Sequence, residues 1–469
     1  MQIKFGTDGW RGVIARDFTF DNLTTVAQAT MDYLVRKGLD KKGLIIGHDR
    51  RFLSRDFAMK VAEVAAGNGL HVLLSDGYAP TPAISWAVRK TGSGAGIMIT
   101  ASHNPPEYNG FKIKESFGGS ALPTTTKEVE EILAFNLASG RRIEQYPFHD
   151  AVADGLIELF DPLTGYFEQI KRYVDIDLIL KANIPAVIDP MFGAGSGLAP
   201  LLLPNLKEIH NIENPSFGGQ APEPIGEHLA ELSSLVRSGK YRIGLALDGD
   251  ADRIGAVDEN GDFFSSHCIF VVVLRHLIEH KKMRGGVVKT VSTTTMVDLL
   301  AEKFGLELFE TPIGFKHICD LMLKKDILMG GEESGGLGVK GHIPERDGIL
   351  LALLLLEAMA VTGKGLRRML NKTMDEIGHF FYRRIDRKIE ANAKASLIQR
   401  LKSEPPKRID YRDVIRTNFS DGFKFIFENG DWLLVRPSGT EPVLRLYSEA
   451  ASPAQVDRLL VAAEALADL

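Results

Sequence analysis

The sequence predicts an α/β fold of three successive domains with related topology, followed by a smaller α+β domain. Three observations lead to this prediction. Short apolar runs of strand length alternate with segments of helical periodicity over most of the chain. At 469 residues the chain exceeds what one hydrophobic core organises, since domains hold roughly 150 residues. After Gly365 the alternation changes, and two strands meet at the hairpin signal Asn429-Gly430.

The first α/β unit is predicted over residues 1–148. Helical spacing of apolar residues occurs at 20–37 and 55–67, and a further helix begins near Thr81. Strands are predicted at 43–47, 71–75 and 96–100, and their alternation with helices favours a largely parallel sheet. A charged helix at 126–139 precedes the polar stretch 140–154, where we place the first boundary.

Three further units follow. The second, 149–253, has a helix at 165–174, strands at 184–189 and 243–248, and a glycine-rich turn at 191–197. This turn is similar to a dinucleotide-binding fingerprint, but Gly197 comes one residue too early. The third unit, 254–368, has a strand at 286–289 and helices at 294–304 and 349–362. The fourth, 369–469, contains the strands 423–428 and 432–435.

Composition and charge exclude several classes of protein. Hydrophobic residues at 44% and charged residues at 25% are typical of a globular protein. A net charge of -5 argues against a nucleic-acid-binding surface, which needs clustered Lys and Arg. Cys268 and Cys319 cannot form a disulfide framework, and the apolar segment 348–361 is too short for a membrane span and predicts a buried helix. We expect a cytoplasmic protein without nucleic-acid or membrane partners.

Four loops place polar side chains directly after predicted strands, where open α/β sheets bind ligands. The first, TASHNP at 100–105, offers Ser102 as a nucleophile. A lone serine at the end of a strand is also a common turn residue. Because there is no G-x-S-x-G elbow, an ordinary hydrolase triad is not indicated. Taken alone, this loop leaves both interpretations of Ser102 open.

The second loop, DGDADR at 248–253, favours a metal site. Asp248, Asp250 and Asp252 alternate along the chain, so their carboxylates can converge on one hard cation. The spacing also fits a calcium-binding EF-hand, but Arg253 replaces its sharp-turn glycine and the flanking segments predict strands. A solvated acidic turn is the other alternative.

The third and fourth loops carry groups suited to a phosphorylated sugar. In GEESGG at 331–336, Glu332 and Ser334 can bond hydroxyl groups, and the glycines let a ligand approach the backbone. In RPSGTEP at 436–442, a guanidinium, two hydroxyls and exposed backbone amides can cradle a phosphate. Both compositions also occur in ordinary turns.

Together and in this order, the four loops resemble the signature loops of the α-D-phosphohexomutase superfamily. The resemblance extends to FGTDGWRG at 5–12, DRR at 49–51 and TPIGFK at 311–316, so it covers essentially the whole chain. It implies four domains around a deep central cleft, the last similar to the TATA-binding-protein fold. It also implies an enzyme that moves a phosphoryl group on sugar phosphates, which we expect to be a monomer or a weak homodimer.

The resemblance implies a role for each loop. Ser102 is the phosphorylated serine, whose phosphate binds Mg2+ together with Asp248, Asp250 and Asp252. The catalytic candidates beside it are Arg11, His103, Lys112 and Arg253. The residues expected to bind the substrate are Lys316, Glu332, Ser334, Arg436, Ser438, Gly439 and Thr440. Arg346 stands where glucose-specific members carry a lysine; because arginine stays protonated, His342 is an alternative proton carrier, with a structural role as the other interpretation.

The third loop also indicates which sugar is used. Members that accept mannose and glucose phosphates show GEMSGH, and glucosamine phosphate mutases show GEQSGH, whereas GEESGG resembles the glucose type. We therefore expect interconversion of glucose 1-phosphate and glucose 6-phosphate, with glucose 1,6-bisphosphate as intermediate and activator. The alternatives are a phosphomannomutase or dual-specificity mutase, a glucose 1,6-bisphosphate synthase, and a non-enzymatic calcium- or sugar-phosphate-binding protein.

Overall fold

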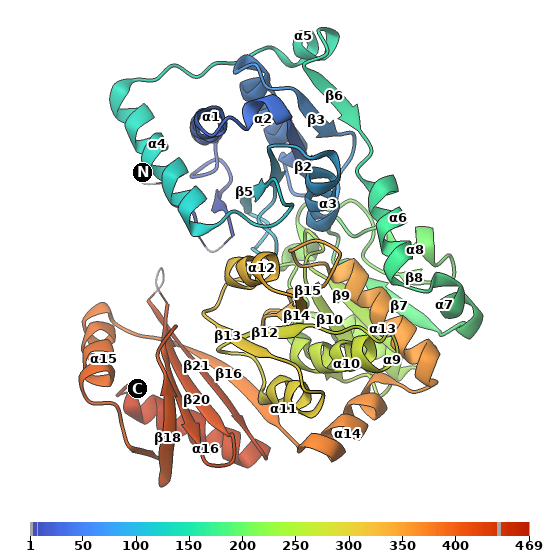
Figure 1. The fold of residues 1–469 in the computed structure, drawn as a ribbon, viewed down its shortest axis with the longest axis vertical. Coiled ribbons are helices and arrows are strands. Elements are labelled where there is room, and N and C mark those ends of the chain that lie inside the picture. The colour runs from blue at the N-terminus through green and yellow to red at the C-terminus, as the bar shows by residue number, and fades with distance from the viewer. Residues whose placement is uncertain (1–2, 7, 439–441, 469) are drawn as a thin grey trace.

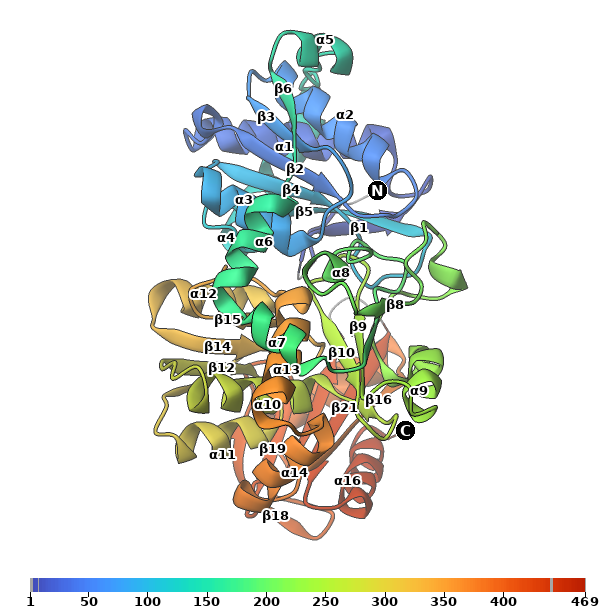
Figure 2. The same cartoon turned by 90° about the vertical axis from the view of Figure 1, so that its right-hand side faces the viewer.

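The computed structural model describes residues 3–6, 8–438 and 442–468, and it contains four β-sheets in four consecutive domains. In Figure 1 the first domain lies at the top, the second and third occupy the middle, and the fourth lies at the lower left. Figure 2 shows the same succession from α5 at one end to β18 at the other. The predicted order of three α/β units and a C-terminal α+β unit is confirmed.

The first domain is built on a six-stranded sheet in the order β1-β5-β4-β2-β3-β6. The inner strands β2, β3 and β4 are parallel, whereas β5 is antiparallel to both of its neighbours, β4 and β1, so the sheet is mixed. Leu44 and Ile46 face the core with α1, α2 and α4, while Ile45 faces α3, as the alternation of a strand requires. The strands are β1 (Trp10–Val13), β2 (Leu44–His48), β3 (Val72–Ser75), β4 (Ala95–Ile99), β5 (Tyr108–Glu115) and β6 (Ile157–Phe160). The helices are α1 (Phe20–Arg36), α2 (Ser54–Gly67), α3 (Thr81–Thr91), α4 (Pro123–Ser139) and α5 (Phe148–Ala153).

The second domain has the sheet β11-β10-β9-β7-β8, and the third has β13-β12-β14-β15. Each has parallel inner strands and an antiparallel edge. In the second domain the elements are α6 (Leu163–Tyr173), α7 (Ile176–Ala182), β7 (Ala186–Asp189), α8 (Ala199–Leu202), β8 (Lys207–Glu208), α9 (Ala230–Arg237), β9 (Ile243–Leu247), β10 (Ile254–Val257) and β11 (Phe263–Phe264). In the third they are α10 (Ser266–Glu279), β12 (Gly286–Thr290), α11 (Thr295–Lys303), β13 (Leu308–Thr311), α12 (Phe315–Lys324), β14 (Ile327–Gly331), β15 (Leu337–Val339), α13 (Gly348–Thr362) and α14 (Leu366–Ile377).

Helix α13 joins the second and third domains into one hydrophobic core. Its residues from Gly348 to Met359 are buried, and they pack in the same cluster as Leu245 of β9 and Met329 of β14. The apolar segment predicted as a buried helix is therefore confirmed. Within the described residues, no single helix is long and apolar enough to cross a membrane; α13 and α14 together reach that length and composition but are bent by 77°.

The sheets extend past the predicted domain boundaries. Strand β6 pairs in parallel with β3, so the first sheet continues to Phe160, beyond the boundary placed after 148. Strands β10 and β11 return antiparallel to β9, so the second sheet continues past residue 253. The boundary at 368 falls inside α14, which packs on the shared core through Leu370 and Met374. The polar connector 140–154 and the tight loop between β9 and β10 both interrupt the apolar pattern of the sequence. Such an interruption is also what the end of a domain produces, so the sequence alone does not distinguish the two.

The fourth domain is a six-stranded antiparallel sheet in the order β16-β21-β20-β19-β18-β17. Its helices share one core with the sheet, through Leu397 of one and Leu459 of the other, so both cover the same face. This is the TATA-binding-protein-like arrangement that was expected. The predicted hairpin joins β19 to β20, with Gly430 at φ 78°. The elements are β16 (Phe381–Lys388), α15 (Ala391–Ser403), β17 (Arg408–Ile409), β18 (Arg412–Asn418), β19 (Phe423–Phe427), β20 (Trp432–Pro437), β21 (Val443–Ala450) and α16 (Pro453–Leu466).

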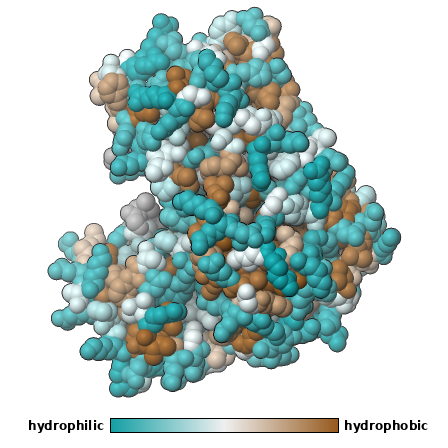
Figure 3. Space-filling model, in the orientation of Figure 1, coloured by the Kyte–Doolittle hydropathy of each residue, from teal (hydrophilic) through white to brown (hydrophobic). Residues whose placement is uncertain are grey.

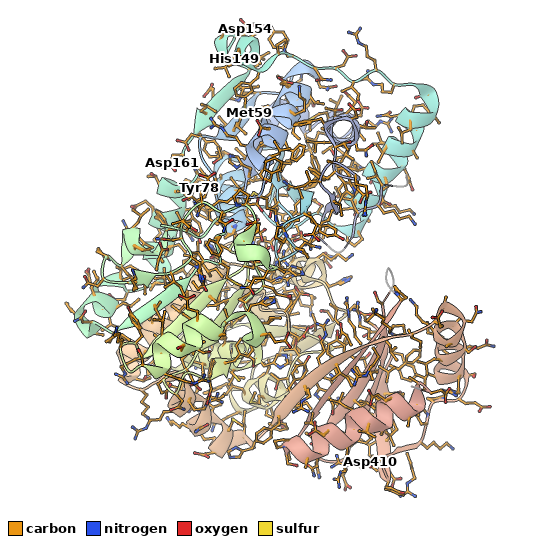
Figure 4. The ribbon with its side chains drawn as sticks, turned by 180° about the vertical axis from the view of Figure 1, so that it is seen from behind. Met59, Tyr78, His149, Asp154, Asp161 and Asp410 are labelled. Carbon is orange, nitrogen blue, oxygen red and sulfur yellow. The ribbon has the colours of Figure 1, made fainter. Side chains whose placement is uncertain are left out.

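The first and second domains meet beside Tyr78, which is labelled in the rear view (Figure 4). The Tyr78 hydroxyl donates to the carbonyl oxygen of Ser196 at 3.2 Å, and the Arg50 guanidinium lies 4.8 Å from the centre of its ring. Arg50 also donates to the carbonyl oxygen of Asn211 at 3.1 Å. These contacts join the segments that follow β2 and β3 to the segments that follow β7 and β8.

Candidate active site

Ser102 lies in the loop that follows β4, and it is fully buried. Its hydroxyl donates to Oδ2 of Asp248 at 2.8 Å, and its amide donates to Oγ1 of Thr100 at 2.9 Å. The φ angle of Ser102 is 53°, in the left-handed region that is unfavourable for a residue with a side chain. Such a conformation persists only where the surroundings impose it, and here it directs the hydroxyl at the second domain.

Asp49 and Arg51, in the loop after β2, hold the Ser102 loop in place. Arg51 donates from Nη2 to the carbonyl oxygens of Ser102 and Asn104, each at 2.6 Å. Asp49 accepts a hydrogen bond from Thr100 at 2.6 Å, and its Oδ2 lies 3.3 Å from Nε of Arg51. The carboxylate thus orients both the threonine and the arginine that fix the serine.

The three aspartates follow β9 in a loop that returns directly into β10. Because β9 and β10 are antiparallel strands, the helix–loop–helix geometry of an EF-hand is excluded. Candidate ligand atoms of Asp248, Asp250 and Asp252 lie within 4.8 Å of one another, and all three residues are buried. A Cβ at Gly249 would lie 2.4 Å from the carbonyl oxygen of Ser102, so glycine is needed for the two loops to approach this closely.

The donor set fits a hard divalent cation such as Mg2+. Among the residues that the structure describes, Asp250 Oδ1 and Asp252 Oδ1 are buried without a hydrogen-bond partner. Burial, reinforced by the neighbouring Asp250 and Asp252, raises the pKa of Asp248 well above its usual value. Clustered carboxylates of this kind are costly to bury unless a cation compensates them, and carboxylate oxygens are the ligands that Mg2+ prefers.

Lys112 on β5 supplies positive charge to the same cluster. Its Nζ lies 2.8 Å from Asp8 Oδ2, 2.8 Å from Asp250 Oδ2 and 3.3 Å from Asp252 Oδ2. Burial alone would lower the pKa of Lys112, but Asp250 and the other two carboxylates outweigh it and raise the pKa. Lys112 therefore stays protonated, a geometry that favours its electrostatic role over the exchange of a proton.

Arg11, His103 and Arg253 line the open side of this cluster. Nδ1 of His103 is 3.4 Å from the Ser102 hydroxyl oxygen. Burial, followed by the charge of Arg253, lowers the pKa of His103 well below its usual value, so the imidazole is neutral. Arg11 bonds Asn104 at 2.5 Å, and Arg253 lies 4.0 Å from Asp248 and Asp252. A neutral ring and two guanidiniums thus surround the serine.

A cleft of about 1040 Å³ is lined by all four domains and reaches His103 and Asn104, whereas the fully buried Ser102 and the three aspartates do not line it. The space-filling view shows the molecule hollowed on one side between the first and the fourth domain (Figure 3). The lining residues include Arg11 and His103 from the first domain, Arg253 from the second, Lys316, Glu332 and Ser334 from the third, and Arg436 and Ser438 from the fourth. Gly439 and Thr440 lie outside the described residues. The structure thus brings the four predicted loops to one cavity.

Glu332, at the end of β14, is held by the segment that precedes α12. Gly314 donates from its amide to Oε1 of Glu332 at 2.9 Å. Burial raises the pKa of Glu332, while the charges of Arg346 and Arg253 oppose this shift. The next residue, Glu333, is 3.4 Å from Arg384 of β16, so the loop also touches the fourth domain.

Comparison with known proteins agrees with this geometry. Four sequence patterns match in chain order: "Phosphoglucomutase/phosphomannomutase, alpha/beta/alpha domain I" over residues 2–138, domain II over 164–261, domain III over 265–377, and the C-terminal domain over 388–466. The chain belongs to the phosphoglucomutase/phosphomannomutase family. It is therefore a member of the α-D-phosphohexomutase superfamily, and its enzymatic class is that of a phosphohexomutase.

The relatives differ in the sugar that their names specify. A "Phosphoglucomutase/phosphomannomutase" of Thermococcus kodakarensis is 32% identical and covers 96% of this chain and 94% of its own. A "Probable phosphoglucosamine mutase" of Methanosphaera stadtmanae is 31% identical, with coverages of 95% and 94%. A crystal structure of a "putative phosphomannomutase" from Thermus thermophilus is 34% identical over the full length of both chains, with a TM-score of 0.86.

Arg346 occupies the centre of this phosphohexomutase site. Its Nη2 lies 2.5 Å from Asp8 and 2.7 Å from Asp252, and its side chain passes over Gly336, where a Cβ would lie 2.3 Å from Cδ. Burial lowers the pKa of Arg346, but Asp252 and Asp8 outweigh it and raise the pKa. His342 is buried, bonds Asp347 at 2.8 Å and does not line the cleft. The geometry therefore favours a structural role for His342 and a fixed charge at Arg346.

Several residues of the site had no assigned role from the sequence. Asp8 contacts both Lys112 and Arg346, and Thr81 bonds Asp250 from the start of α3. Gly193 lies in the turn that is similar to a dinucleotide-binding fingerprint, and it packs against the metal loop, DGDADR at 248–253. A Cβ at position 193 would lie 2.7 Å from the carbonyl oxygen of Gly249. The only available signals were the position of Asp8 inside FGTDGWRG and the glycines of 191–197.

Proposed function

We propose that this phosphohexomutase interconverts glucose 1-phosphate and glucose 6-phosphate by way of a phosphorylated Ser102 and glucose 1,6-bisphosphate. The observation that carries the proposal is the 2.8 Å contact between the Ser102 hydroxyl and Asp248 within the buried carboxylate cluster. In the same cleft, Arg436 and Ser438 lie on the wall formed by the fourth domain. The side with Ser102 and the carboxylate cluster is suited to the phosphate that reacts, and the wall formed by the fourth domain is suited to a phosphate that is bound without reacting.

The residues divide the work of the transfer. The O–P bond of phosphorylated Ser102 breaks, a new O–P bond forms to the free hydroxyl of the hexose monophosphate, and the proton of that hydroxyl ends on the serine oxygen. Asp248, Asp250 and Asp252 would hold Mg2+, which neutralises the charge of the transferring group when it is bound. Arg11 and Lys112 add positive charge at the same place.

The second half of the cycle regenerates the phosphoserine. The hexose bisphosphate turns over, so that its other phosphate faces Ser102 and the transferred one lies at Arg436. The serine hydroxyl, next to the neutral His103 ring, attacks this phosphorus, and its proton ends on the sugar oxygen of the isomeric monophosphate that leaves. A single cradle on the opposite wall serves both orientations of the bisphosphate.

The sugar loop supports glucose over mannose and glucosamine. Glu332 is fixed by Gly314, and position 336 has no room for a side chain because Arg346 crosses it. A loop of the GEMSGH or GEQSGH type would place a histidine there. We therefore propose that hydroxyl recognition rests on Glu332 and Ser334 without a third side chain from position 336.

Two experiments test the function. The first is turnover of glucose, mannose and glucosamine 1-phosphates, and the proposal predicts the highest kcat/KM for glucose 1-phosphate. A preference for either other sugar would overturn the choice of glucose while leaving the mutase reaction intact. The second is intact-mass analysis after incubation with glucose 1,6-bisphosphate, which we expect to add one phosphate to the wild type and none to Ser102→Ala.

The same variants distinguish the alternatives. If Ser102→Ala kept full turnover, the phosphoserine route would be refuted. If neither protein turned over any hexose phosphate, the family reaction itself would be absent and a binding role would remain. A cytoplasmic location stays a prediction, and cell fractionation tests it.

A further inference from the structure

The segment Thr311–Lys316 matches a motif of the family, and it connects two parts of the cleft that recognise different groups. It lies between β13 and α12. We infer that Gly314 and Asp421 are positioning residues that set the spacing between the phosphate-binding Arg436 and the hydroxyl-binding Glu332. This inference rests on the proposed function, because it takes the roles of Arg436 and Glu332 from it.

Asp421 links the fourth domain to this segment. It lies just before β19, and its Oδ1 accepts a hydrogen bond from Nε of Arg436 at 2.9 Å. Its Oδ2 accepts a hydrogen bond from the amide of Ile313 at 3.0 Å. One carboxylate therefore orients the guanidinium on its own domain and anchors it to the backbone of the third domain. Such charge-assisted bonds are stronger than neutral ones and fix a direction.

Gly314 links the next amide of the same segment to the sugar loop. Its N–H donates to Oε1 of Glu332 at 2.9 Å, one residue after the amide that holds Asp421. Its dihedral angles are φ 127° and ψ 121°, a conformation that only glycine adopts without strain. This backbone turn directs two consecutive amides at two carboxylates on different domains.

The spacing that results is chemically specific. The amides of residues 313 and 314 belong to two planar peptide units that share the Cα of Ile313, so the two N–H groups stay close and the backbone angles of that residue set their relative direction. Arg436 is thus joined to Glu332 through the carboxylate of Asp421 and two consecutive backbone amides. Arg384 adds a second link between the same two domains, at 3.4 Å from Glu333. A sugar phosphate of the correct length contacts both ends at once, whereas a shorter one contacts only one.

The test compares a hexose phosphate with a shorter sugar phosphate. We would measure kcat/KM of the full-length protein for glucose 1-phosphate and for ribose 1-phosphate, and take the ratio. In Asp421→Asn and in Gly314→Ala we expect this ratio to fall about tenfold, the loss of one well-placed hydrogen bond, mainly through the KM for the hexose. A Cβ at Gly314 would meet no atom closer than 3.7 Å, so this variant changes backbone conformation and not packing.

Two controls match these variants. Asp413→Asn removes an exposed aspartate that pairs with Arg408 of the same domain, and neither residue lines the cleft. Gly363→Ala replaces a glycine with φ 66° and open surroundings at the end of α13. Neither should change the ratio. Equal losses for both sugars in Asp421→Asn, or the same fall in Asp413→Asn, would overturn the inference.

The outcome also separates this inference from the proposed function. If the wild type is an active mutase and the ratio stays constant in Asp421→Asn, only the spacing role fails. If the wild type turns over no hexose phosphate, the proposed function fails and the spacing role fails with it.

Discussion

Substitution of Gly336 by alanine tests the close contact between the sugar loop and Arg346. The new Cβ would lie 2.3 Å from Cδ and 2.9 Å from Cγ of Arg346, whereas carbon atoms normally approach to about 3.5–4.0 Å. The φ angle of Gly336 is not in the left-handed region, so alanine adds no backbone strain there. Arg346 would have to move by about 1 Å or more.

Arg346 cannot move freely, because its far end is held by Asp8 and Asp252. Overpacking of a filled site costs about 1–3 kcal/mol, and we expect about 2 kcal/mol for Gly336→Ala. The second and third domains share one core and should unfold together. For a unit of this size, a loss of about 1 kcal/mol lowers the thermal midpoint by about 2–4 °C. The thermal midpoint of that unit should therefore fall by about 4–8 °C.

A double-mutant cycle isolates the contact. In an Arg346→Ala background the space above residue 336 is vacated, so Gly336→Ala should then lower the midpoint by less than about 2 °C. Gly77→Ala is the matched control, since a Cβ there meets nothing within 4 Å. Differential scanning calorimetry of the four proteins of the cycle and of the control gives the result. An equal loss from Gly336→Ala in both backgrounds would refute the steric argument.

Three further predictions concern buried charge. Burial lowers the pKa of His267 to about 3, so between pH 6.5 and 3 the unfolded chain binds one more proton than the folded chain. The free energy of unfolding should therefore fall by about 1.4 kcal/mol for each unit by which the pH decreases in this range. Urea titrations of His267→Phe should lack this contribution to the pH dependence. Burial and the nearby Lys289 lower the pKa of Lys424 to about 8. Because the unfolded chain then binds more protons than the folded chain, the free energy of unfolding should rise from about pH 8 to 10.5. A rise of the same size in Lys424→Met would contradict this prediction. Removal of Mg2+ with EDTA should abolish turnover, and Asp250→Asn should weaken Mg2+ binding in calorimetry at least tenfold; unchanged affinity would exclude Asp250 as a ligand.

The sequence was sufficient to predict the succession of domains and the loops that meet in the cleft. Ser102, Asp248 and Glu332 each follow a buried strand, and each of these strands belongs to a different sheet, at whose carboxyl edge ligands bind. Arg436 differs slightly, since it lies within β20 and not after it. Strand periodicity placed these loops at strand ends, and the resemblance of the four loops to the family then assigned them to one site.

The remaining residues could not be predicted because their contacts are distant in sequence. Asp8 reaches Lys112 and Arg346, and Asp421 reaches the amide of Ile313. The motif that contains Asp8 does not indicate these contacts, and Asp421 lies in no motif. The same holds for β6, a short edge strand whose pairing depends on a connector that crosses the first domain. Tertiary packing decided these cases, and local propensity did not.

The common core around α13 limits how the chain can be recombined with its relatives. The buried face of this helix is completed by strands on both sides of the predicted boundary at residue 253. A chimera that exchanged only the second or only the third domain would set two independently evolved halves of one interior against each other. Exchanging residues 164–377 as one cassette keeps that interior intact, and it transfers the metal loop and the sugar loop together.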